Sequence, residues 1–347
     1  MLALVYHGPL DLRIEEVPTP AFNPDEILLK VLSASICGTD MRIYHGDHRK
    51  VPAGTSRIPG HEVVGEIAAA GDHVQGYTPG QRIFVAPNIG CGHCLQCISG
   101  NNNRCSNYQA IGITMDGGFA EFMRIPSAFI TQGNLLPLSD NVDLGVAALS
   151  EPFACVLRGQ DALHIRPGES VLVMGAGPIG IMHARLARLK GAGRILVSDL
   201  NPQRAAQAAR LGADRVVNPD LENLAEIVLA ETAGRGVDVI IVAAPSHAAQ
   251  EQALQLAGIG GRINFFGGLP KDNPTIRFDS NLAHYKELLV TATTACSTLD
   301  CWRAAEIINS GCIDLAPVIS ARLPLKEGLQ AFAMMEAGKH LKIVLEP

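Results

Sequence analysis

The sequence predicts an α/β protein in which a doubly wound parallel sheet accompanies a β-rich domain. From Ser170 onward, short β-branched runs alternate with segments of helical spacing, which is typical of a parallel sheet covered by helices. Before about residue 150, short strand candidates are instead bounded by Pro and Gly. The length of 347 residues also suits two domains better than one core.

The expected elements follow the chain in order. In the β-rich part, strands are expected at 27–32, 62–67 and 82–86, and Ala-rich helical spacing then runs from Leu144 to Leu157. In the alternating part, strands are expected at 171–174, 195–198, 237–242, 261–266 and 287–291, with helices at 179–190 and 203–211. The tail from about Thr294 is mixed, with a helix near 302–308.

The composition is that of an ordinary globular protein and argues against several kinds of partner. The formal net charge is −6 and there is no Lys/Arg block, which argues against nucleic acid and anionic membranes. No apolar run reaches the length of a membrane span. The N-terminal segment lacks a basic lead and a cleavage site, and nine cysteines is an odd number. We therefore expect the cytoplasm, a reducing compartment.

Four cysteines have a metal-ligand spacing, C-x₂-C-x₂-C-x₇-C. They are Cys91, Cys94, Cys97 and Cys105, on a Gly- and Asn-rich loop. Four thiolates fill a tetrahedron around Zn²⁺ and leave no open position, so a structural zinc is expected. Two disulfides or merely buried thiols are the alternatives, although this spacing is awkward for disulfides in a chain of this size. An iron–sulfur cluster also stays open, because spacing does not choose the metal.

A glycine-rich loop predicts a dinucleotide site of the Rossmann type. Gly175-Ala-Gly177-Pro178-Ile179-Gly180 follows a predicted strand and opens a predicted helix, which is the context this motif requires. Gly175 permits the tight turn, Gly177 lets the backbone approach a pyrophosphate, and Gly180 allows close packing of helix on strand. The helix N-terminus supplies the anion site. The structural alternative is a simple tight turn.

An acid follows at the end of the next predicted strand. Asp199 is expected to accept hydrogen bonds from the adenosine ribose hydroxyls and to repel a 2′-phosphate, which favours NAD over NADP. An alternative role for Asp199 is as a helix N-cap. Arg204 leaves NADP open, because a guanidinium there could bind a phosphate.

Several further motifs, taken together, are specific for one family. They are Cys37-Gly-Thr-Asp40, Pro59-Gly-His-Glu62, Pro79-Gly-Gln-Arg82, Gly117-Gly-Phe-Ala-Glu121, Glu151-Pro152, the four-cysteine loop and the glycine loop. Over essentially its whole length the chain resembles the zinc-containing medium-chain dehydrogenases/reductases. The resemblance implies a GroES-like catalytic domain over 1–152, a Rossmann NAD-binding domain over 153–293, and a return to the catalytic domain over 294–347.

The resemblance also implies two zinc ions, one catalytic and one structural. The catalytic zinc would be held by Cys37, His61 and a carboxylate. Alcohol dehydrogenases typically have another Cys where this chain has Glu151, so the Glu62 and Glu151 pair looks like the polyol (sorbitol-type) and threonine dehydrogenase branch. Glu62 would be a direct ligand or a group that orients His61, and Glu151 a ligand or a water-mediated neighbour.

Two departures from the family bear on the substrate. Sorbitol-type enzymes carry an Arg, thought to contact the polyol, where this chain reads Cys296-Ser-Thr-Leu-Asp-Cys301. Many relatives carry a relay His where this chain has Arg42, which puts that proton path in doubt. His45 is close in sequence and could substitute, although a surface position is the more ordinary role for it.

We therefore expect reversible oxidation of a secondary alcohol of a polyol or sugar-derived substrate, with hydride transfer to NAD. Thr39 is expected to relay the proton, because a hydroxyl both accepts and donates, although it could be a turn hydroxyl only. Gly267 would lie beside the nicotinamide, or form a strand-end turn. Alternatives are a same-family dehydrogenase for an amino alcohol such as threonine, an aldonate, a diol or a sugar phosphate, and remotely an NAD-sensing or structural zinc protein. Family resemblance suggests a homo-oligomer, a dimer or tetramer, that acts on a small molecule.

Overall fold

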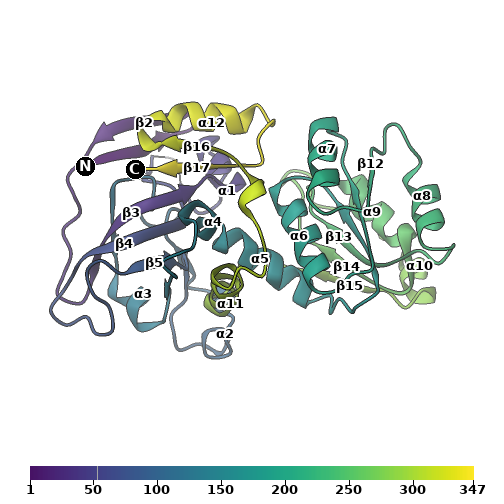
Figure 1. Ribbon diagram of the computed structural model, residues 1–347, viewed down its shortest axis with the longest axis horizontal. Helices are drawn as coiled ribbons and strands as arrows, with labels where there is room; N and C mark the ends of the chain where they lie inside the picture. Colours follow the sequence, from purple (N-terminus) through teal and green to yellow (C-terminus); the bar gives the residue numbers. More distant parts are fainter. Residues whose placement is uncertain (53) are drawn as a thin grey trace. The chain divides into compact units, whose positions relative to one another are not determined.

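The computed structural model describes residues 1–52 and 54–347. It forms two compact units, one made of residues 1–154 and 295–347 and the other of residues 155–294. The expected boundaries, at 152/153 and 293/294, fall beside these divisions. The first unit is therefore discontinuous in sequence, and the second is inserted within it (Figure 1).

A seven-stranded sheet organises the first unit. Its strands are β3 (Ile27–Ser35), β4 (Glu62–Ala70), β5 (Arg82–Val85), β8 (Phe122–Ile125), β9 (Leu135–Pro137), β16 (Ile319–Pro324) and β17 (Lys342–Glu346). The order is β16-β17-β3-β4-β5-β9, with β8 also paired to β3. Two small antiparallel pairs accompany it, β1 (Leu2–Gly8) with β2 (Asp11–Glu16) and β6 (Asn88–Ile89) with β7 (Gln109–Ala110).

Strand register brings three distant segments to one end of this sheet. Ser35, the last residue of β3, lies opposite Glu62 at the start of β4 and opposite Val344 in β17. The β3–β4 and β3–β17 pairings are antiparallel. The residues after β3, those at the start of β4 and Lys342 therefore meet at the same place.

The helices of this unit are short apart from three. They are α1 (Gly38–Tyr44), α2 (Leu95–Ile98), α3 (Ser127–Thr131), α4 (Leu144–Ala148), α5 (Ser150–Asp161, which continues into the second unit), α11 (Thr298–Asn309) and α12 (Gly328–Glu336), with 3₁₀ turns at 102–104, 316–318 and 325–327. Helix α11 begins four residues before the predicted start at 302. Its N-cap Ser297 accepts from Asp300 N and Asp300 accepts from Ser297 N, a capping box that defines the start.

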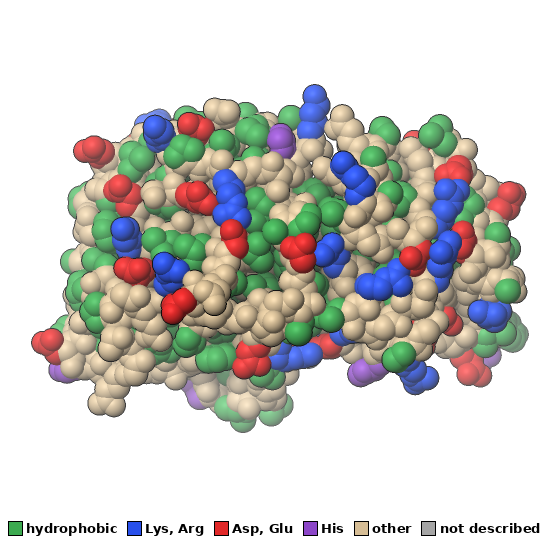
Figure 2. All heavy atoms as spheres, in the orientation of Figure 1, with side chains coloured by type: hydrophobic (Ala, Val, Ile, Leu, Met, Phe, Trp, Pro, Cys, Tyr) green, Lys and Arg blue, Asp and Glu red, His purple; other side chains and the backbone are tan. Residues whose placement is uncertain are grey.

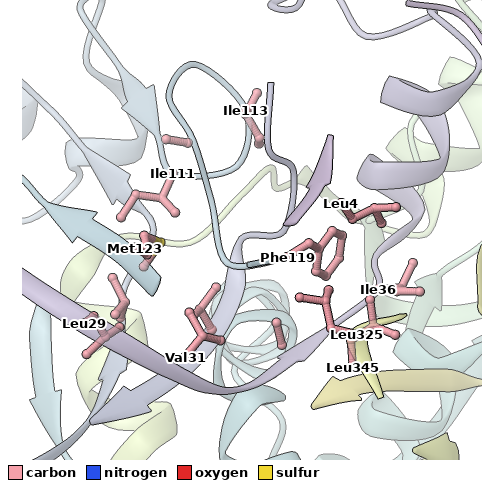
Figure 3. Packing of buried hydrophobic residues seen from close by; sticks show 14 of the residues in the cluster. Leu4, Leu29, Val31, Ile36, Ile111, Ile113, Phe119, Met123, Leu325 and Leu345 are labelled. Carbon is pink, nitrogen blue, oxygen red and sulfur yellow. The ribbon is translucent and has the colours of Figure 1, made fainter. Parts of the chain in front are cut away.

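Side chains from distant parts of the chain form the core of the first unit. Phe119, Leu4, Ile36, Leu325 and Leu345 are each at most 2% exposed and lie together in Figure 3. Leu325 and Leu345 belong to the C-terminal part of the chain, whereas the others belong to the N-terminal part. Burial of apolar surface, worth about 25 cal/mol per Å², thus ties the two parts into one unit.

The second unit contains a six-stranded parallel sheet. Its strands are β10 (Ser170–Met174), β11 (Arg194–Ser198), β12 (Arg215–Val217), β13 (Val237–Val242), β14 (Ala257–Phe265) and β15 (Leu289–Ala292). The order β12-β11-β10-β13-β14-β15 reverses direction at β10, so the prediction of a doubly wound parallel sheet is confirmed. Strand β12 was missed by the sequence analysis.

Helices cover both faces of this sheet. They are α6 (Pro178–Leu189), α7 (Pro202–Arg210), α8 (Leu224–Glu231), α9 (His247–Leu256) and α10 (Ser280–Tyr285). Alternate strand residues enter opposite apolar clusters, with Val171 and Val173 on one face and Leu172 and Met174 on the other. A strand buried on both faces has no polar alternation, which explains the continuous apolar runs in the sequence.

The surface shows charges of both signs. On the face in Figure 2, Lys and Arg side chains are interspersed with Asp and Glu, and no large patch of one sign is visible. Among the described residues, no helix has both the length and the apolar character needed to cross a bilayer.

A buried histidine in α6 makes the stability of the second unit depend on pH. His183 is fully buried, its backbone oxygen accepts from Gln160 Nε2 at 2.7 Å, and its ring packs edge-on against Phe266 at 4.7 Å. Burial, aided by the charge of Lys190, lowers the pKa of His183 to about 3. In the unfolded chain a histidine titrates near 6.5.

We predict that His183 makes the protein less stable in mild acid. Between about pH 6.5 and 3 the unfolded chain binds one more proton at this site than the folded chain, so stability falls as pH falls. When the pH falls from 6 to 4.5, wild type should lose about 2 kcal/mol more unfolding free energy than His183→Met does. Urea unfolding followed by circular dichroism measures this. The exposed control His284→Gln should behave as wild type; parallel pH curves for His183→Met and wild type would contradict the prediction.

Candidate functional site

The four cysteines of the Gly- and Asn-rich loop lie together, as the sequence analysis expects. We call residues 90–105 the four-cysteine lobe. The Sγ atoms of Cys91, Cys94, Cys97 and Cys105 lie within 4.8 Å of one another. Cys94 Sγ is 3.5 Å from Cys97 Sγ and 3.8 Å from Cys105 Sγ. A tetrahedron with Zn–S bonds of about 2.3 Å has edges of about 3.8 Å, so the donor set fits zinc.

Local backbone geometry favours the thiolate of Cys91, whereas burial raises the pKa of Cys97 to about 12. Hydrogen bonds from the backbone N–H groups of His93 and Cys94 lower the pKa of Cys91 to about 6. Because the thiolate is the metal ligand, a lowered pKa favours metal binding at neutral pH. Cys105 Sγ also accepts from Cys91 N at 3.3 Å.

A second group of ligand-type side chains lies at the end of the large sheet. Cys37 precedes α1, and His61 and Glu62 begin β4, so the β3–β4 register brings them together. One ligand atom from each lies within 4.8 Å of the others. His61 is 4% exposed and Glu62 fully buried. A thiol, an imidazole and a carboxylate are a donor set that suits zinc with a further position open.

Asp40 supports this group. Its Oδ2 accepts from Cys37 N at 2.8 Å, and its Oδ1 lies 3.4 Å from His61 Nδ1. Burial lowers the pKa of His61, but the charges of Asp40 and Cys37 outweigh burial and raise it well above 6.5. The group therefore attracts positive charge, as a cation site must. Asp40, rather than Glu62, is the carboxylate that faces the His61 ring.

Glu62 has a buried counter-charge. Both of its carboxylate oxygens accept from Lys342 Nζ at 2.5 Å, and Ser35 Oγ also donates to it. Lys342 Nζ donates to Ile36 O at 3.1 Å as well. Burial alone would lower the pKa of Lys342, but the charges of Glu62 and Cys37 raise it above its usual value. The ammonium therefore neutralises a carboxylate that has no access to water.

Glu151 occupies a neighbouring position. It lies in the first turn of α5 and belongs to a different group of ligand-type side chains, which includes Cys296. Cys296 Sγ lies 3.5 Å from Glu151 Oε1. Glu62 and Lys342 are still affected by the charge of Glu151, so the two carboxylates share one electrostatic environment. Glu62 is the one whose carboxylate lies within 4.8 Å of the ligand atoms of Cys37 and His61.

The structure places the residues considered for proton transfer in different surroundings. Thr39 Oγ1 accepts from Arg42 Nη2 at 3.2 Å, which leaves the Thr39 hydroxyl proton available for donation elsewhere. His45 pairs with Glu336 at 3.1 Å on the surface. His48, which the sequence analysis missed, is half-buried; burial, followed by the charges of Arg42 and His61, lowers its pKa to about 4.

The glycine loop has the shape that a dinucleotide phosphate needs. Gly177 is the N-cap of α6, with Pro178 and Ile179 in its first turn, and nothing lies within 4 Å of where a Gly177 Cβ would be. A Cβ on Gly180 would lie 1.8 Å from Gly175 O, so only glycine permits the tight strand-to-helix packing. The backbone at Gly177 is therefore open to an anion at the helix N-terminus.

Asp199 lies beside this loop. Its Oδ2 accepts from Ala176 N at 2.6 Å and its Oδ1 accepts from Asn201 N at 2.7 Å. The N-cap of α7 is Asn201, so the alternative role of Asp199 as N-cap does not apply. Arg204 lies in the first turn of α7.

Gly267 follows β14 at the same edge of the parallel sheet. Gly267 N donates to Val242 O at 2.8 Å, and Gly267 O accepts from the Gln250 amide at 3.0 Å. These bonds fix the turn where strand β14 ends.

Sequence reasoning missed Asp40, Lys342 and His48. Asp40 could have been found from its place in the Cys37 motif, whereas Lys342, 280 residues from Glu62, carries no local signal.

Comparison with known proteins agrees with this geometry. Residues 23–137 match the alcohol dehydrogenase GroES-like domain and residues 178–310 match the zinc-binding dehydrogenase domain. The L-threonine 3-dehydrogenase of Bacillus velezensis is 32% identical over 336 residues, which is 96% of this chain and 95% of that protein. The chain belongs to the zinc-containing medium-chain dehydrogenases. It is an oxidoreductase that acts on CH–OH donors.

Solved structures of such dehydrogenases have the same fold. A protein of Sinorhizobium meliloti described as a zinc-binding dehydrogenase and bound to NADP superimposes with a TM-score of 0.92 and 31% identity, over 100% of this chain and 99% of that one. An alcohol dehydrogenase of Escherichia coli CFT073 complexed with NADH superimposes with a TM-score of 0.90 and 27% identity, with the same coverage. Members with this fold thus bind either dinucleotide.

We predict that the buried Glu62–Lys342 pair stabilises the first unit. Lys342→Met leaves a buried carboxylate without its counter-charge and is expected to cost about 3–5 kcal/mol of unfolding free energy. Chemical denaturation at neutral pH measures the loss. The double variant Glu62→Gln/Lys342→Met should recover part of it, and the exposed control Lys339→Met should be neutral. A loss below 1 kcal/mol in Lys342→Met would contradict the prediction.

Proposed function

We propose that the protein is a zinc-dependent, NAD-linked dehydrogenase that reversibly oxidises a secondary alcohol of a polyol or sugar-derived substrate. The observation that carries the proposal is the convergence of Cys37, His61 and Glu62 at the end of the large sheet. A carboxylate in place of a second thiolate makes this a harder, oxygen-preferring site. The four-cysteine lobe would hold a second, structural zinc.

Zinc, when bound, supplies a Lewis acid that makes an alcohol hydroxyl more acidic, and NAD supplies the hydride acceptor. Cys37 and His61 would hold the metal, and Asp40, whose Oδ1 lies 3.4 Å from His61 Nδ1, would orient the His61 ring. Lys342 keeps Glu62 from carrying an uncompensated charge before the metal arrives. The Thr39 hydroxyl, which already accepts from Arg42, would pass a proton from the substrate hydroxyl toward solvent.

Two carboxylates can serve as the third zinc ligand. Glu62 has the shorter reach to Cys37 and His61, but its oxygens already bind Lys342 and Ser35. Glu151 belongs to a different group and contacts the Cys296 thiol. We propose that Glu62 and Glu151 both serve the metal, Glu151 as a direct or water-mediated ligand.

NAD is proposed as the cofactor, with Gly175, Gly177, Pro178, Ile179, Gly180 and Gly267 lining its site. Asp199 supports NAD over NADP, because its carboxylate is oriented by two backbone N–H groups beside the glycine loop. A fixed negative charge there disfavours a 2′-phosphate.

Threonine, or another alcohol that carries a carboxylate or phosphate, is the second candidate substrate. The similarity to the L-threonine 3-dehydrogenase of Bacillus velezensis supports it, as does Arg42, which lies 3.2 Å from Thr39 Oγ1 and could attract a carboxylate or phosphate. Arg42→Met should then lower kcat/KM for threonine and aldonates more than for neutral polyols, which distinguishes the two substrate classes.

The function predicts metal-dependent turnover of secondary alcohols. Zinc-loaded protein should reduce NAD⁺ with at least one member of a panel of polyols, short diols, threonine and aldonates, followed by absorbance of the reduced cofactor. A chelator that removes zinc from the Cys37 site should abolish turnover, and Cys37→Ser should reduce it by more than the 10–100-fold typical of outer-shell changes.

Cys312→Ser is the matched control, because Cys312 is exposed and lies outside all three cysteine-containing groups. It should keep wild-type activity. Full activity of Cys37→Ser would refute the catalytic metal site, and the absence of turnover with the whole panel would refute the dehydrogenase proposal.

Asp199 is predicted to set the preference between dinucleotides. Asp199→Asn keeps an acceptor toward Ala176 N or Asn201 N but removes the charge, so the kcat/KM ratio of NAD to NADP should fall about tenfold, or 1.4 kcal/mol. Steady-state kinetics with both dinucleotides measures this. Asp220→Ala, an exposed acid of the same unit, is the control; an unchanged ratio in Asp199→Asn would assign cofactor choice to another residue.

We also propose a cytoplasmic homo-oligomer. All nine cysteines are free, which suits a reducing compartment. Apolar side chains are exposed near the β15 edge of the parallel sheet, namely Ile259, Phe278, Tyr285 and Leu289. Light scattering should give a dimer or tetramer of the 36.8 kDa chain, and Leu289→Lys should shift it toward monomer; a wild-type monomer at all concentrations would exclude assembly.

A further inference from the structure

The Glu151 carboxylate lies in a buried corner of the first unit. Glu151 lies in the first turn of α5, and Cys296 immediately precedes the N-cap of α11. Cys296 is fully buried, and its thiol donates toward Glu151 Oε1 across 3.5 Å. The two residues are 145 positions apart, so this contact is made by the tertiary fold.

Cys296 is itself held in place. Asn88 Nδ2 donates to Cys296 O at 2.8 Å and points at Cys296 Sγ at 3.5 Å. Cys301 Sγ lies 3.5 Å from Cys296 Sγ on the other side and is also fully buried. A buried side chain with this many neighbours has few rotamers open to it, so the direction of the Cys296 thiol is defined.

Asn88 connects this corner to the four-cysteine lobe. Tyr108 OH donates to Asn88 Oδ1 at 2.5 Å, and the Asn102 amide donates to Asn88 O at 2.8 Å. Asn102 lies between Cys97 and Cys105 in the lobe, and its Oδ1 accepts from Thr298 N in the first turn of α11. The lobe is therefore bonded both to Asn88 and to the helix start that follows Cys296.

We propose that Cys296 is a positioning residue for Glu151, an inference that rests on the proposed function. Asn88 and Asn102 make the position of Cys296 depend on the four-cysteine lobe. A neutral thiol can orient the carboxylate while leaving its charge available to a metal. A cationic side chain at the same place would pair with Glu151 and compete with the metal for it. The lobe thus acts on the reaction through a hydrogen-bonded chain.

The first test compares two substitutions of Cys296 in protein loaded with Co²⁺, whose visible absorption reports its ligands. Cys296→Ala, which removes the donor, should change the absorption of the cobalt at the Cys37 site and weaken its binding 10–100-fold. Cys296→Ser, which keeps a donor, should restore both toward wild type. Cys312→Ser, which is exposed, is the matched control.

The outcomes separate the inference from the function on which it rests. If wild type binds cobalt and turns over but Cys296→Ala has the same spectrum and affinity, Cys296 does not position Glu151. If Cys296→Ser behaves like Cys296→Ala, hydrogen-bond donation is not the reason. Failure of wild type itself to bind a second cobalt or to oxidise any alcohol would instead refute the proposed function.

The link to the lobe is tested by the reactivity of the Cys296 thiol. Asn102→Ala should speed alkylation of Cys296 by iodoacetamide several-fold in zinc-loaded protein, as read by peptide mass spectrometry, whereas Gln96→Ala in the same lobe should not. Tyr108→Phe removes only the hydroxyl that bonds Asn88 and should also speed alkylation of Cys296. It serves as the test if Asn102→Ala fails to fold. Wild-type alkylation rates in Tyr108→Phe and in folded Asn102→Ala would overturn the link.

Discussion

The pairing of β3 with both β4 and β17 is the constraint on which the candidate metal site depends. It places Ser35 opposite Glu62 on one side and Val344 on the other. The buried ion pair between Glu62 and Lys342 follows from that register, because a shift by one residue would turn Lys342 to the opposite face of the sheet. Register thus decides whether the buried carboxylate has a counter-charge, and the rest of the site is arranged around that carboxylate.

The two kinds of metal group differ in how the chain builds them. The four-cysteine lobe takes all its ligands from one short loop, so its geometry is local and fits a closed tetrahedron. The group at Cys37 takes its residues from the ends of two strands, and its supporting carboxylate and ammonium come from α1 and β17. Three ligand-type side chains, in place of four, would leave one coordination position open.

Local signals explain what the sequence could predict. The glycine loop and the cysteine spacing need only neighbouring residues, and the strands of the parallel sheet, buried on both faces, read as continuous apolar runs. Lys342, Asn88 and Asn102 could not be assigned roles, because their partners are set by tertiary contacts across the first unit. Strands β16 and β17 were missed for a related reason, since each is stabilised by pairing with the other.

The discontinuity of the first unit has a consequence for biosynthesis. The chain emerges from the ribosome N-terminus first, so residues 155–294 are complete, and able to fold, before the strand that carries Lys342 exists. Until then β3 lacks one neighbour and Glu62 is without its ammonium. Completion of the candidate metal site therefore waits for the strand that carries Lys342, which is translated after the whole second unit.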